Sequence, residues 1–186
     1  GEAGAAWRMT TGKVGRGHYG YEKNGAGALL AAIEPLTGQR LGLVRAQRTK
    51  KEYTEFCQEL VKHWPEAKKI QLVQDNLNTH NASSFYENLP AEEAFALAQK
   101  FEFHYTPKSA SWLNMIEIEF SALARECLHR RIPSQERLAR EVLTLITERE
   151  EKRIKINWQF SLTAARKKLN SHYTRVNAEN DKYKET

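Results

Sequence analysis

Residues 69–80, KIQLVQDNLNTH, are the stretch from which the fold of this chain can be worked out. The run 69–74 is short and β-like, and Asp75 directly follows its last residue. Runs of this kind, closed by a turn residue, are typical of strands. Because open α/β sheets place their sites beyond the carboxyl ends of strands, Asp75 is the sharpest functional candidate in the sequence.

The loop after this strand is crowded with polar side chains. Asn76, Asn78 and His80 accompany Asp75 there, which favours a functional site. An Asp-Asn pair after a strand is about equally typical of an ordinary turn in which the Asp side chain caps the next segment. The local pattern leaves both interpretations open.

Strands and helices alternate along the rest of the chain. Upstream, Asn24-Gly25 is a hairpin signal between residues 19–22 and the apolar run 28–33, and a second turn at 35–38 precedes the alternating run 40–45. The other patterns predict a strand at 101–105 and helices at 50–63, 82–88, 91–100, 113–128, 134–147 and 162–169. This order predicts a mixed α/β domain with one sheet, an antiparallel edge and helical layers.

The composition excludes several classes of protein. Of the 186 residues, 28% are charged and 40% are hydrophobic, which fits neither a membrane protein nor a wholly disordered chain. Among 23 acidic residues only Asp75 and Asp181 are Asp, so a site that needs several aspartates, such as an EF-hand, is excluded. The formal charge of +6 permits a polyanionic partner without requiring one.

The cysteines and the two terminal segments further limit the class of protein that this chain can be. Cys57 and Cys127 lie far apart without a CxxC motif, which favours a reduced, cytosolic chain over a disulfide scaffold or a zinc site. No run of 18 apolar residues is present, so no transmembrane span is expected. We interpret residues 1–17, which are Gly-rich and basic, as a flexible lead-in and residues 174–186 as a polar tail.

Two carboxylates near the start of the predicted helix 113–128 are further candidates. At about 100° per residue, Glu117 and Glu119 flank the apolar stripe of that helix on opposite sides. Geometry alone does not choose between them, although Glu117 lies nearer the expected sheet end. Each is also explained as a solvated carboxylate favoured by the helix dipole.

A carboxylate at a strand end and another on a later helix can share divalent metal ions. Mg²⁺ prefers hard oxygen ligands and keeps waters in the rest of its shell. Two such ions about 4 Å apart activate a water or a DNA 3′-hydroxyl and stabilise the leaving oxygen of a phosphodiester. That chemistry usually requires a third carboxylate between the two ions.

The histidines and basic residues give weaker signals. His80 is near enough to Asp75 to orient a carboxylate or a phosphate, whereas the other histidines have no zinc-like spacing and are interpreted as structural or surface residues. Each basic cluster alone is explained as a solvated face, but three of them around a phosphoryl-transfer site favour DNA contact. The clusters comprise Arg45, Arg48, Lys50 and Lys51; Arg125, Arg130, Arg131, Arg137 and Arg140; and Arg166, Lys167 and Lys168.

Several segments resemble the catalytic domain of bacterial insertion-sequence transposases of the mariner superfamily, the DDE superfamily endonucleases. These segments are NGAGALLAAIEPLTGQR (24–40), TKKEY (49–53), KIQLVQDNLNTH (69–80), KFEFHYTPKSASWLNMIEIEFSAL (100–123), and INWQF (156–160) with AARKKL (164–169). The resemblance runs from about Tyr19 to Tyr173, and the VQDNLNTH and SWLNMIE blocks are specific in combination.

The resemblance implies roles for particular residues. The family's second catalytic Asp falls on Asp75, and its catalytic Glu falls on Glu117, inside a motif that begins at Asn114. Asn76 and His80 match positions that accompany the second Asp. By this resemblance both catalytic carboxylates would bind metal, with Mg²⁺ or Mn²⁺ as the cofactor.

The resemblance also implies a fold, a reaction and partners. The fold would be α/β, a ribonuclease-H-like mixed sheet flanked by helices, over residues 18–173. The enzyme would cut DNA at the element's ends and join the 3′-hydroxyl to target DNA, in the bacterial cytoplasm at the nucleoid. Candidate DNA-binding residues are Arg45, Arg48, Lys50, Lys51, Arg130 and Arg131.

One departure matters more than any match. The family's first catalytic Asp lies on the first sheet strand, and no Asp precedes Asp75 here; Glu34 stands in the second-strand region and is not promoted to that role. We therefore expect the C-terminal portion of a transposase, lacking its first strand and one triad member and inactive alone. It would dimerise or aggregate unless the missing N-terminal transposase segment fills the gap. The alternative is a non-catalytic DNA-binding or assembly remnant.

Overall fold

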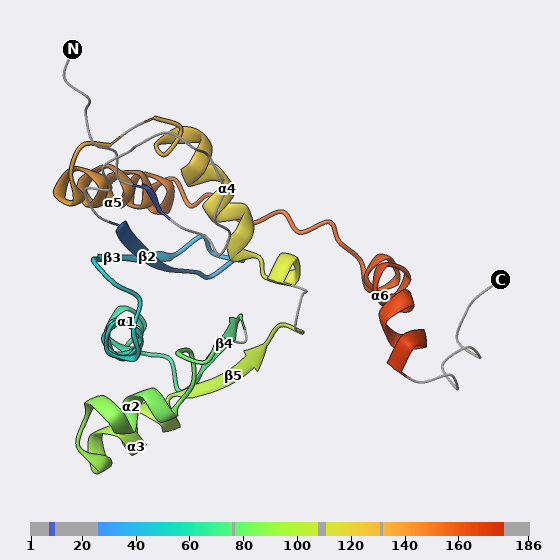
Figure 1. The fold of residues 1–186 in the computed structure, drawn as a ribbon, viewed down its shortest axis with the longest axis horizontal. Coiled ribbons are helices and arrows are strands. Elements are labelled where there is room, and N and C mark those ends of the chain that lie inside the picture. The colour runs from blue at the N-terminus through green and yellow to red at the C-terminus, as the bar shows by residue number, and fades with distance from the viewer. Residues whose placement is uncertain (1–7, 10–25, 76, 108–110, 131, 177–186) are drawn as a thin grey trace, which may run out of the picture. The chain divides into compact units, whose positions relative to one another are not determined.

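The computed structural model describes residues 8–9, 26–75, 77–107, 111–130 and 132–176, and the chain divides into two compact units, Gly1–Ile156 and Asn157–Thr186 (Figure 1). The first unit holds all the described strands and five helices. The second holds helix α6 (Leu162–Val176), which extends past the predicted end at residue 169. No helix in the described ranges is long and apolar enough to cross a membrane.

The strands of the first unit form two small sheets. β2 (Ala26–Ile33) pairs antiparallel with β3 (Arg40–Arg45), and β1 (Arg8–Met9) lies parallel to the start of β2. β4 (Ile70–Gln74) and β5 (Phe101–Tyr105) form a separate parallel pair. The predicted antiparallel pair 28–33 and 40–45 is confirmed. The prediction of one sheet is wrong for the described strands, because no ladder joins β2 to β4.

The sequence led to two expectations about the beginning of the chain, and the structure describes only part of that segment. The predicted hairpin arm at residues 19–22 lies outside the described residues. β1 falls within residues 1–17, which the sequence suggested as a lead-in without regular structure. A strand of two residues has no periodicity to detect, so the sequence pattern could not have indicated it.

The helices begin where the local sequence offers caps. The Thr49 side chain and Glu52 form a capping box at α1 (Lys50–His63), and Ser134 caps α5 (Gln135–Glu151). Pro90 precedes α3 (Ala91–Gln99). The others in this unit are α2 (Ser83–Asn88) and α4 (Ile116–Glu126), with a 3₁₀ turn, Ser111–Leu113, before α4. The predicted helix 113–128 is thus shorter at both ends, because Leu113 ends the 3₁₀ turn and α4 runs only from Ile116 to Glu126.

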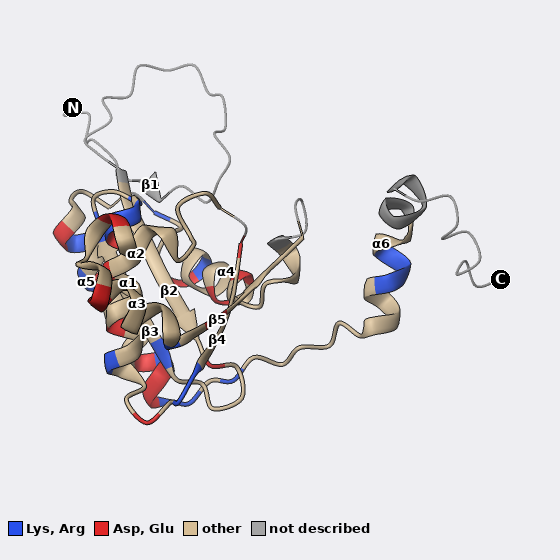
Figure 2. Cartoon of the chain, turned by 90° about the horizontal axis from the view of Figure 1, so that it is seen from below, with Lys and Arg blue, Asp and Glu red and all other residues tan. Residues whose placement is uncertain are grey.

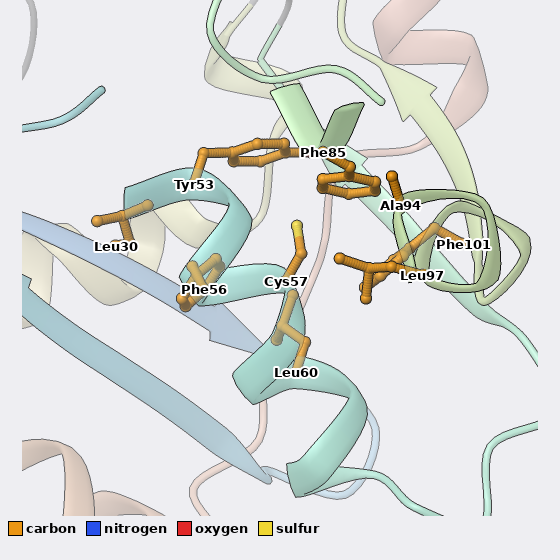
Figure 3. Close-up of a cluster of buried hydrophobic side chains, with 9 residues drawn as sticks. All are labelled: Leu30, Tyr53, Phe56, Cys57, Leu60, Phe85, Ala94, Leu97 and Phe101. Atoms are coloured by element: carbon orange, nitrogen blue, oxygen red, sulfur yellow. The ribbon is translucent and has the colours of Figure 1, made fainter. Parts of the chain in front are cut away.

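One hydrophobic core joins α1 to both sheets. The cluster joins Tyr53, Phe56, Cys57 and Leu60 of α1 to Leu30 of β2, Phe85 of α2 and side chains from α3 and β5, and Figure 3 shows Tyr53 and Cys57 directed toward Phe85. Partly buried residues of β3 and β4 complete this cluster: Leu41, Leu43, Ile70 and Leu72. Because α1 packs against strands of both sheets, it fixes β4 relative to β3 even though the sheets do not share a ladder.

A second core covers the opposite face of β2 and β3. There Leu123 of α4 and Leu138, Val142 and Ile146 of α5 pack on Leu29 and Val44. α5 approaches the sheet closely, since a Cβ atom built on Gly42 would lie 2.4 Å from Cδ1 of Ile146. The β2–β3 ribbon is therefore enclosed between α1 on one side and α4 and α5 on the other (Figure 1).

We expect Gly42→Ala to lower the free energy of unfolding by about 1–3 kcal/mol, because the new methyl group overpacks the contact with Ile146. Ile146→Val, which removes Cδ1, should cost about 1 kcal/mol alone. The double variant should be more stable than the sum of the two single losses predicts, as measured by urea denaturation. Strictly additive losses would contradict the close contact.

Candidate active site

Asp75 lies at the carboxyl end of β4, as the sequence predicted. Its Oδ1 atom is 3.3 Å from Oγ1 of Thr106 and 3.5 Å from Nδ2 of Asn114, both of which donate. Thr106 follows β5, and its backbone N–H donates to the carbonyl of Gln74 at 2.9 Å. Asp75 thus stands where the ends of both parallel strands and the approach to α4 converge, held by two long hydrogen bonds from neutral groups.

Gln74 ties the loop that follows Asp75 back onto the core. Its side chain is 7% exposed, and Oε1 accepts from the Tyr53 hydroxyl at 2.9 Å while Nε2 donates to the His80 carbonyl at 2.8 Å. Within the loop, the N–H of His80 donates to the carbonyl of Leu77 at 2.9 Å. The buried amide therefore ties the carbonyl of His80 to the end of β4 and, through Tyr53, to α1.

His80 lies at the site but is not a cation there. Its ring stacks on Tyr53 with centroids 4.8 Å apart, and Nε2 is buried without a hydrogen-bond partner among the described residues. Burial and the charge of Arg48 lower the pKa of His80 to about 4, against the opposing influence of Asp75. The imidazole is therefore neutral at physiological pH, so it offers a phosphate no positive charge.

Asn114 links the two candidate carboxylates. It is 7% exposed, donates to Asp75, and through Oδ1 accepts the N–H of Ile116 at 3.3 Å at the start of α4. Glu117, in the first turn of α4, donates its own N–H to the Asn114 carbonyl at 3.1 Å. Burial and the negative charge of Asp75 raise the pKa of Glu117, so the two carboxylates lie close enough to repel each other.

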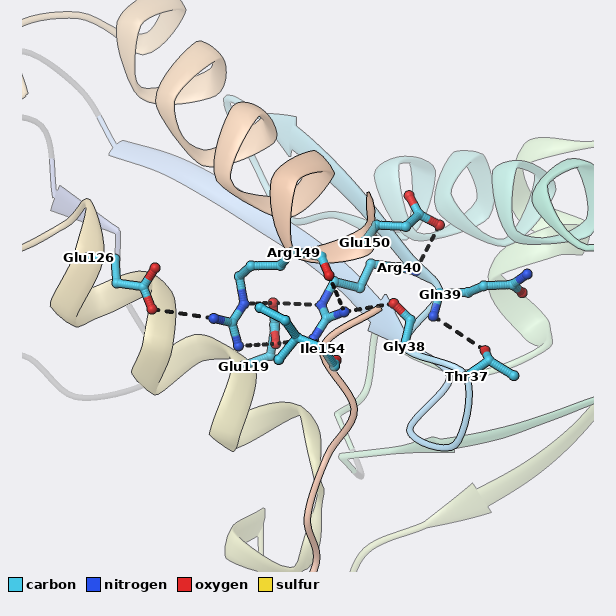
Figure 4. A network of polar contacts seen from close by, with 9 residues as sticks. All are labelled: Thr37, Gly38, Gln39, Arg40, Glu119, Glu126, Arg149, Glu150 and Ile154. Carbon is cyan, nitrogen blue, oxygen red and sulfur yellow. Dashed lines mark hydrogen bonds and ion pairs between the residues drawn. The ribbon is translucent and has the colours of Figure 1, made fainter. Parts of the chain in front are cut away.

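The Glu119 carboxylate forms ion pairs with two arginines (Figure 4). Arg40 reaches it with Nε and Nη2 at 2.9 and 3.2 Å, and Arg149 does the same at 2.9 and 3.2 Å. Glu119 is 2% exposed; burial raises its pKa, but the hydrogen bonds and charges of both guanidinium groups outweigh burial and lower it. We call these three residues the Glu119 clamp. Both of its carboxylate oxygens are engaged, which leaves Glu117 as the carboxylate in the first turn of α4 available to a ligand.

Glu34 has a structural role as well. Its carboxylate accepts the N–H groups of Leu36 and Thr37 at 3.1 and 2.6 Å and closes the turn between β2 and β3. Partial burial raises its pKa, but these bonds with Thr37 and Leu36 lower it overall. Across the described part of the chain, no group of three His, Cys, Asp or Glu side chains is placed to hold a metal ion. The site offers two hard carboxylate donors, Asp75 and Glu117, which suit part of a Mg²⁺ shell.

The basic candidates differ in how they are paired. Arg45 pairs with Glu55 at 3.1 Å, Lys50 with Glu87, and Arg130 with Glu141 at 2.9 Å. Arg48 and Lys51 are exposed, and Arg48 is near enough to His80 to affect its pKa. Figure 2 shows acidic and basic residues interspersed over the helices of the first unit. Arg131 and Asn76 lie outside the described residues.

Sequence reasoning missed several residues that hold the site. Gln74, Tyr53 and Thr106 support the Asp75 loop, while Arg40 and Arg149 fix α4. The available signal was a polar residue, Gln74, closing the strand next to Asp75. No spacing rule connects Arg40 with Arg149, which are far apart in the chain.

Glu119→Gln should lower the free energy of unfolding by about 3–5 kcal/mol, because it leaves the buried Arg40 and the partly buried Arg149 without their shared counter-ion. Since the folded state lowers the pKa of Glu119, this stabilisation is present above its ordinary pKa and is lost as the pH falls through the folded value. Urea denaturation at neutral and acidic pH measures both effects.

Glu117→Gln, two residues from Glu119 on the same helix, is the matched control for Glu119→Gln. It should not lower the free energy of unfolding. The folded state raises the pKa of Glu117, so its ionisation costs stability as the pH rises through that value. The variant should be at least as stable as the wild type at neutral pH, with the difference vanishing in acid. Equal losses in the two variants would contradict the assignment of separate roles.

Gln74→Leu should loosen the Asp75 loop while leaving the second core intact. Loss of the bond to the His80 carbonyl should loosen the turn in which the His80 amide donates to Leu77, and so speed exchange of that amide roughly 5-fold, since a net hydrogen bond is worth about 1 kcal/mol. Tyr53→Phe, which removes only the bond to Gln74, should have a smaller effect. The Val142 amide of α5 serves as the reference, and equal acceleration there would indicate global destabilisation instead.

One of three comparisons with known proteins identifies a family. A family model described as DDE superfamily endonuclease matches residues 3–139, which include Asp75 and Glu117 and end within α5. The match begins inside the segment interpreted as a lead-in. No curated protein and no solved structure matches the chain significantly. Because the match covers well over half of its length, the chain belongs to the DDE superfamily endonuclease family.

Proposed function

We propose that this chain supplies the Asp75 and Glu117 metal-binding carboxylates of a transposase of the mariner superfamily. The observation that carries the proposal is the link through Asn114, whose side chain donates to Asp75 and whose carbonyl accepts the N–H of Glu117, while the charge of Asp75 contributes to a raised pKa of Glu117. Carboxylates that repel each other in this way accommodate a divalent cation between or beside them. The full enzyme would cut DNA at the ends of a bacterial insertion sequence and join the 3′-hydroxyl to target DNA.

The chemistry of the donors fits Mg²⁺ or Mn²⁺. When bound, such ions activate the attacking oxygen and stabilise the leaving oxygen of the phosphodiester. The protein's part is to position: Thr106 and Asn114 orient the Asp75 carboxylate, and Asn114 also sets the first turn of α4. The Glu119 clamp holds α4 against β3 and α5, which fixes the helix that presents Glu117.

The proposed chemistry calls for one more metal ligand than the described part of the chain supplies. Two-ion phosphoryl transfer usually needs a third carboxylate, and the described residues bring none beside Asp75 and Glu117. The nearest sequence candidate, Glu34, is engaged by backbone N–H groups of its own turn. We therefore propose that the chain as given is inactive alone and that another segment supplies the third ligand.

A ribonuclease-H-like fold is the finer structural proposal. The support is that α1 packs against both β3 and β4, so the two sheets share one covered face although no ladder joins them. β1 already lies on the edge of β2 away from β3, and a longer strand there that also paired with β4 would merge the two sheets into a mixed sheet. The alternative function, a non-catalytic DNA-binding or assembly remnant, predicts the same packing without metal binding.

Mn²⁺ binding separates these two functions. The wild-type chain should bind Mn²⁺ weakly, measured by the loss of the free-ion electron paramagnetic resonance signal. Asp75→Asn and Glu117→Gln should each abolish that binding, because each removes one of the two hard ligands. Glu93→Gln, an exposed carboxylate on α3, should leave it unchanged. Equal binding by all four proteins would support the remnant.

Plasmid nicking tests the proposal that this chain lacks a third metal ligand. In Mg²⁺ or Mn²⁺ the purified chain should nick supercoiled DNA no faster than its Asp75→Asn variant. Nicking that depends on Asp75 would show that the chain already holds a complete site, and the proposal of a missing ligand would be wrong.

A further inference from the structure

The longest stretch of this sequence without an acidic residue lies near its C-terminal end. Residues 152–178 contain no Asp or Glu and seven basic residues: Lys152, Arg153, Lys155, Arg166, Lys167, Lys168 and Arg175. The second unit alone has six basic and three acidic residues, which gives it half of the chain's formal +6 in less than one fifth of its length. The positive charge of this protein is therefore concentrated in its smaller unit.

In the first unit, several basic residues are paired with acidic residues of the same unit. Arg45, Lys50, Arg130, Arg137 and Arg149 each pair with a glutamate of the same unit. Their charge is largely neutralised locally, which reduces the field they present to a polyanion. Along α6 no acidic side chain is available at any position to pair with a basic residue on the same helix.

The basic residues of α6 are presented on a regular helix. Arg166, Lys167 and Lys168 are exposed, and Figure 2 shows the described part of α6 in blue and tan without red. At about 100° per residue the three side chains project over a broad arc, opposite a narrow stripe formed by Leu162, Ala165 and Leu169. A helix of this kind can follow a charged backbone and contact several phosphates together.

We propose that α6 is a binding site for the phosphate backbone of duplex DNA, separate from the Asp75–Glu117 site. The inference rests on the proposed function for the presence of DNA as a substrate. Residues Arg166, Lys167 and Lys168 contact phosphates and carry no sequence information, since backbone contacts position a protein without reading bases. Their role is to hold the DNA substrate to the chain.

An anionic membrane is the other polyanion that a basic helix can bind. Interfacial helices bury a large apolar face rich in Leu, Phe or Trp. The apolar stripe of α6 is narrow, with an alanine between its two leucines. The polar arc, with its three adjacent cations, is the larger surface, and it matches DNA better than lipid.

The test measures binding of the full chain to a fluorescein-labelled 30-base-pair duplex by anisotropy, in EDTA, over a series of salt concentrations. The variant Arg166→Gln/Lys167→Gln/Lys168→Gln removes three charges while keeping good helix formers. The slope of log K against log salt should decrease in magnitude by up to about 2.7, which is 0.9 for each of three phosphate contacts. At 0.1 M salt the affinity should fall roughly 10-fold or more.

Two further variants control the experiment. Lys62→Gln/Lys68→Gln/Lys69→Gln removes the same charge from exposed positions before β4, at the end of that strand opposite Asp75, and should change the slope little. Arg166→Lys/Lys167→Arg/Lys168→Arg keeps all three charges and should bind as the wild type does. Circular dichroism checks that every variant keeps its helix content.

Each outcome decides the proposal. Equal loss in the two Gln triple variants would overturn it, because net charge rather than α6 would then govern binding. Wild-type binding to vesicles of 30% phosphatidylglycerol in phosphatidylcholine, with no binding to the duplex, would also overturn it in favour of lipid. Because the assay contains no metal, α6-dependent DNA binding without Mn²⁺ binding at Asp75 would uphold this inference while the proposed catalytic function failed.

Discussion

The Glu119 clamp is the interaction on which the geometry of the first unit depends. Two guanidinium groups share one buried carboxylate, and Arg40 also donates to the carbonyls of Gly38, Arg149 and Ile154. β3, α4 and the end of α5 therefore meet around a single charge cluster. A buried carboxylate is tolerated only when its charge and hydrogen bonds are compensated, and the two arginines supply both. α4 consequently has one defined position on the sheet, and Glu117 is presented from it.

The surroundings of the two candidate metal ligands, Asp75 and Glu117, differ in their effect on the charged carboxylate. Asp75 receives hydrogen bonds from the neutral groups of Thr106 and Asn114, while burial and the charge of Asp75 raise the pKa of Glu117. The repulsion between the two carboxylates is locally unfavourable to folding. Functional sites often retain strained or destabilised groups of this kind. Glu119, only two residues away, has its pKa lowered by the arginines. One turn of helix thus holds a satisfied structural carboxylate and an unsatisfied one.

Much of this arrangement was predictable from local sequence rules. The strand before Asp75, the helices with Thr49 and Ser134 caps, and the antiparallel pair β2–β3 all follow from periodicity and capping. The choice between Glu117 and Glu119 did not, because both flank the apolar stripe equally. What distinguishes them is Arg40 and Arg149, which contact Glu119 from distant parts of the chain. Periodicity describes one helix at a time and contains no information on such contacts.

The distribution of charge gives the two units different capacities. Several arginines of the first unit form ion pairs within it, which offsets part of its surface charge, and in the proposed function its chemistry depends on carboxylates held at defined positions. The second unit has no acidic residue along α6, so no acidic neighbour on that helix offsets the attraction of its basic residues to a phosphate backbone. Phosphate contacts can tether DNA without precise geometry, whereas phosphoryl transfer needs ligands placed to within a fraction of an ångström. Tethering can therefore reside on a separate helix, while the chemistry requires the buried supports of the first unit.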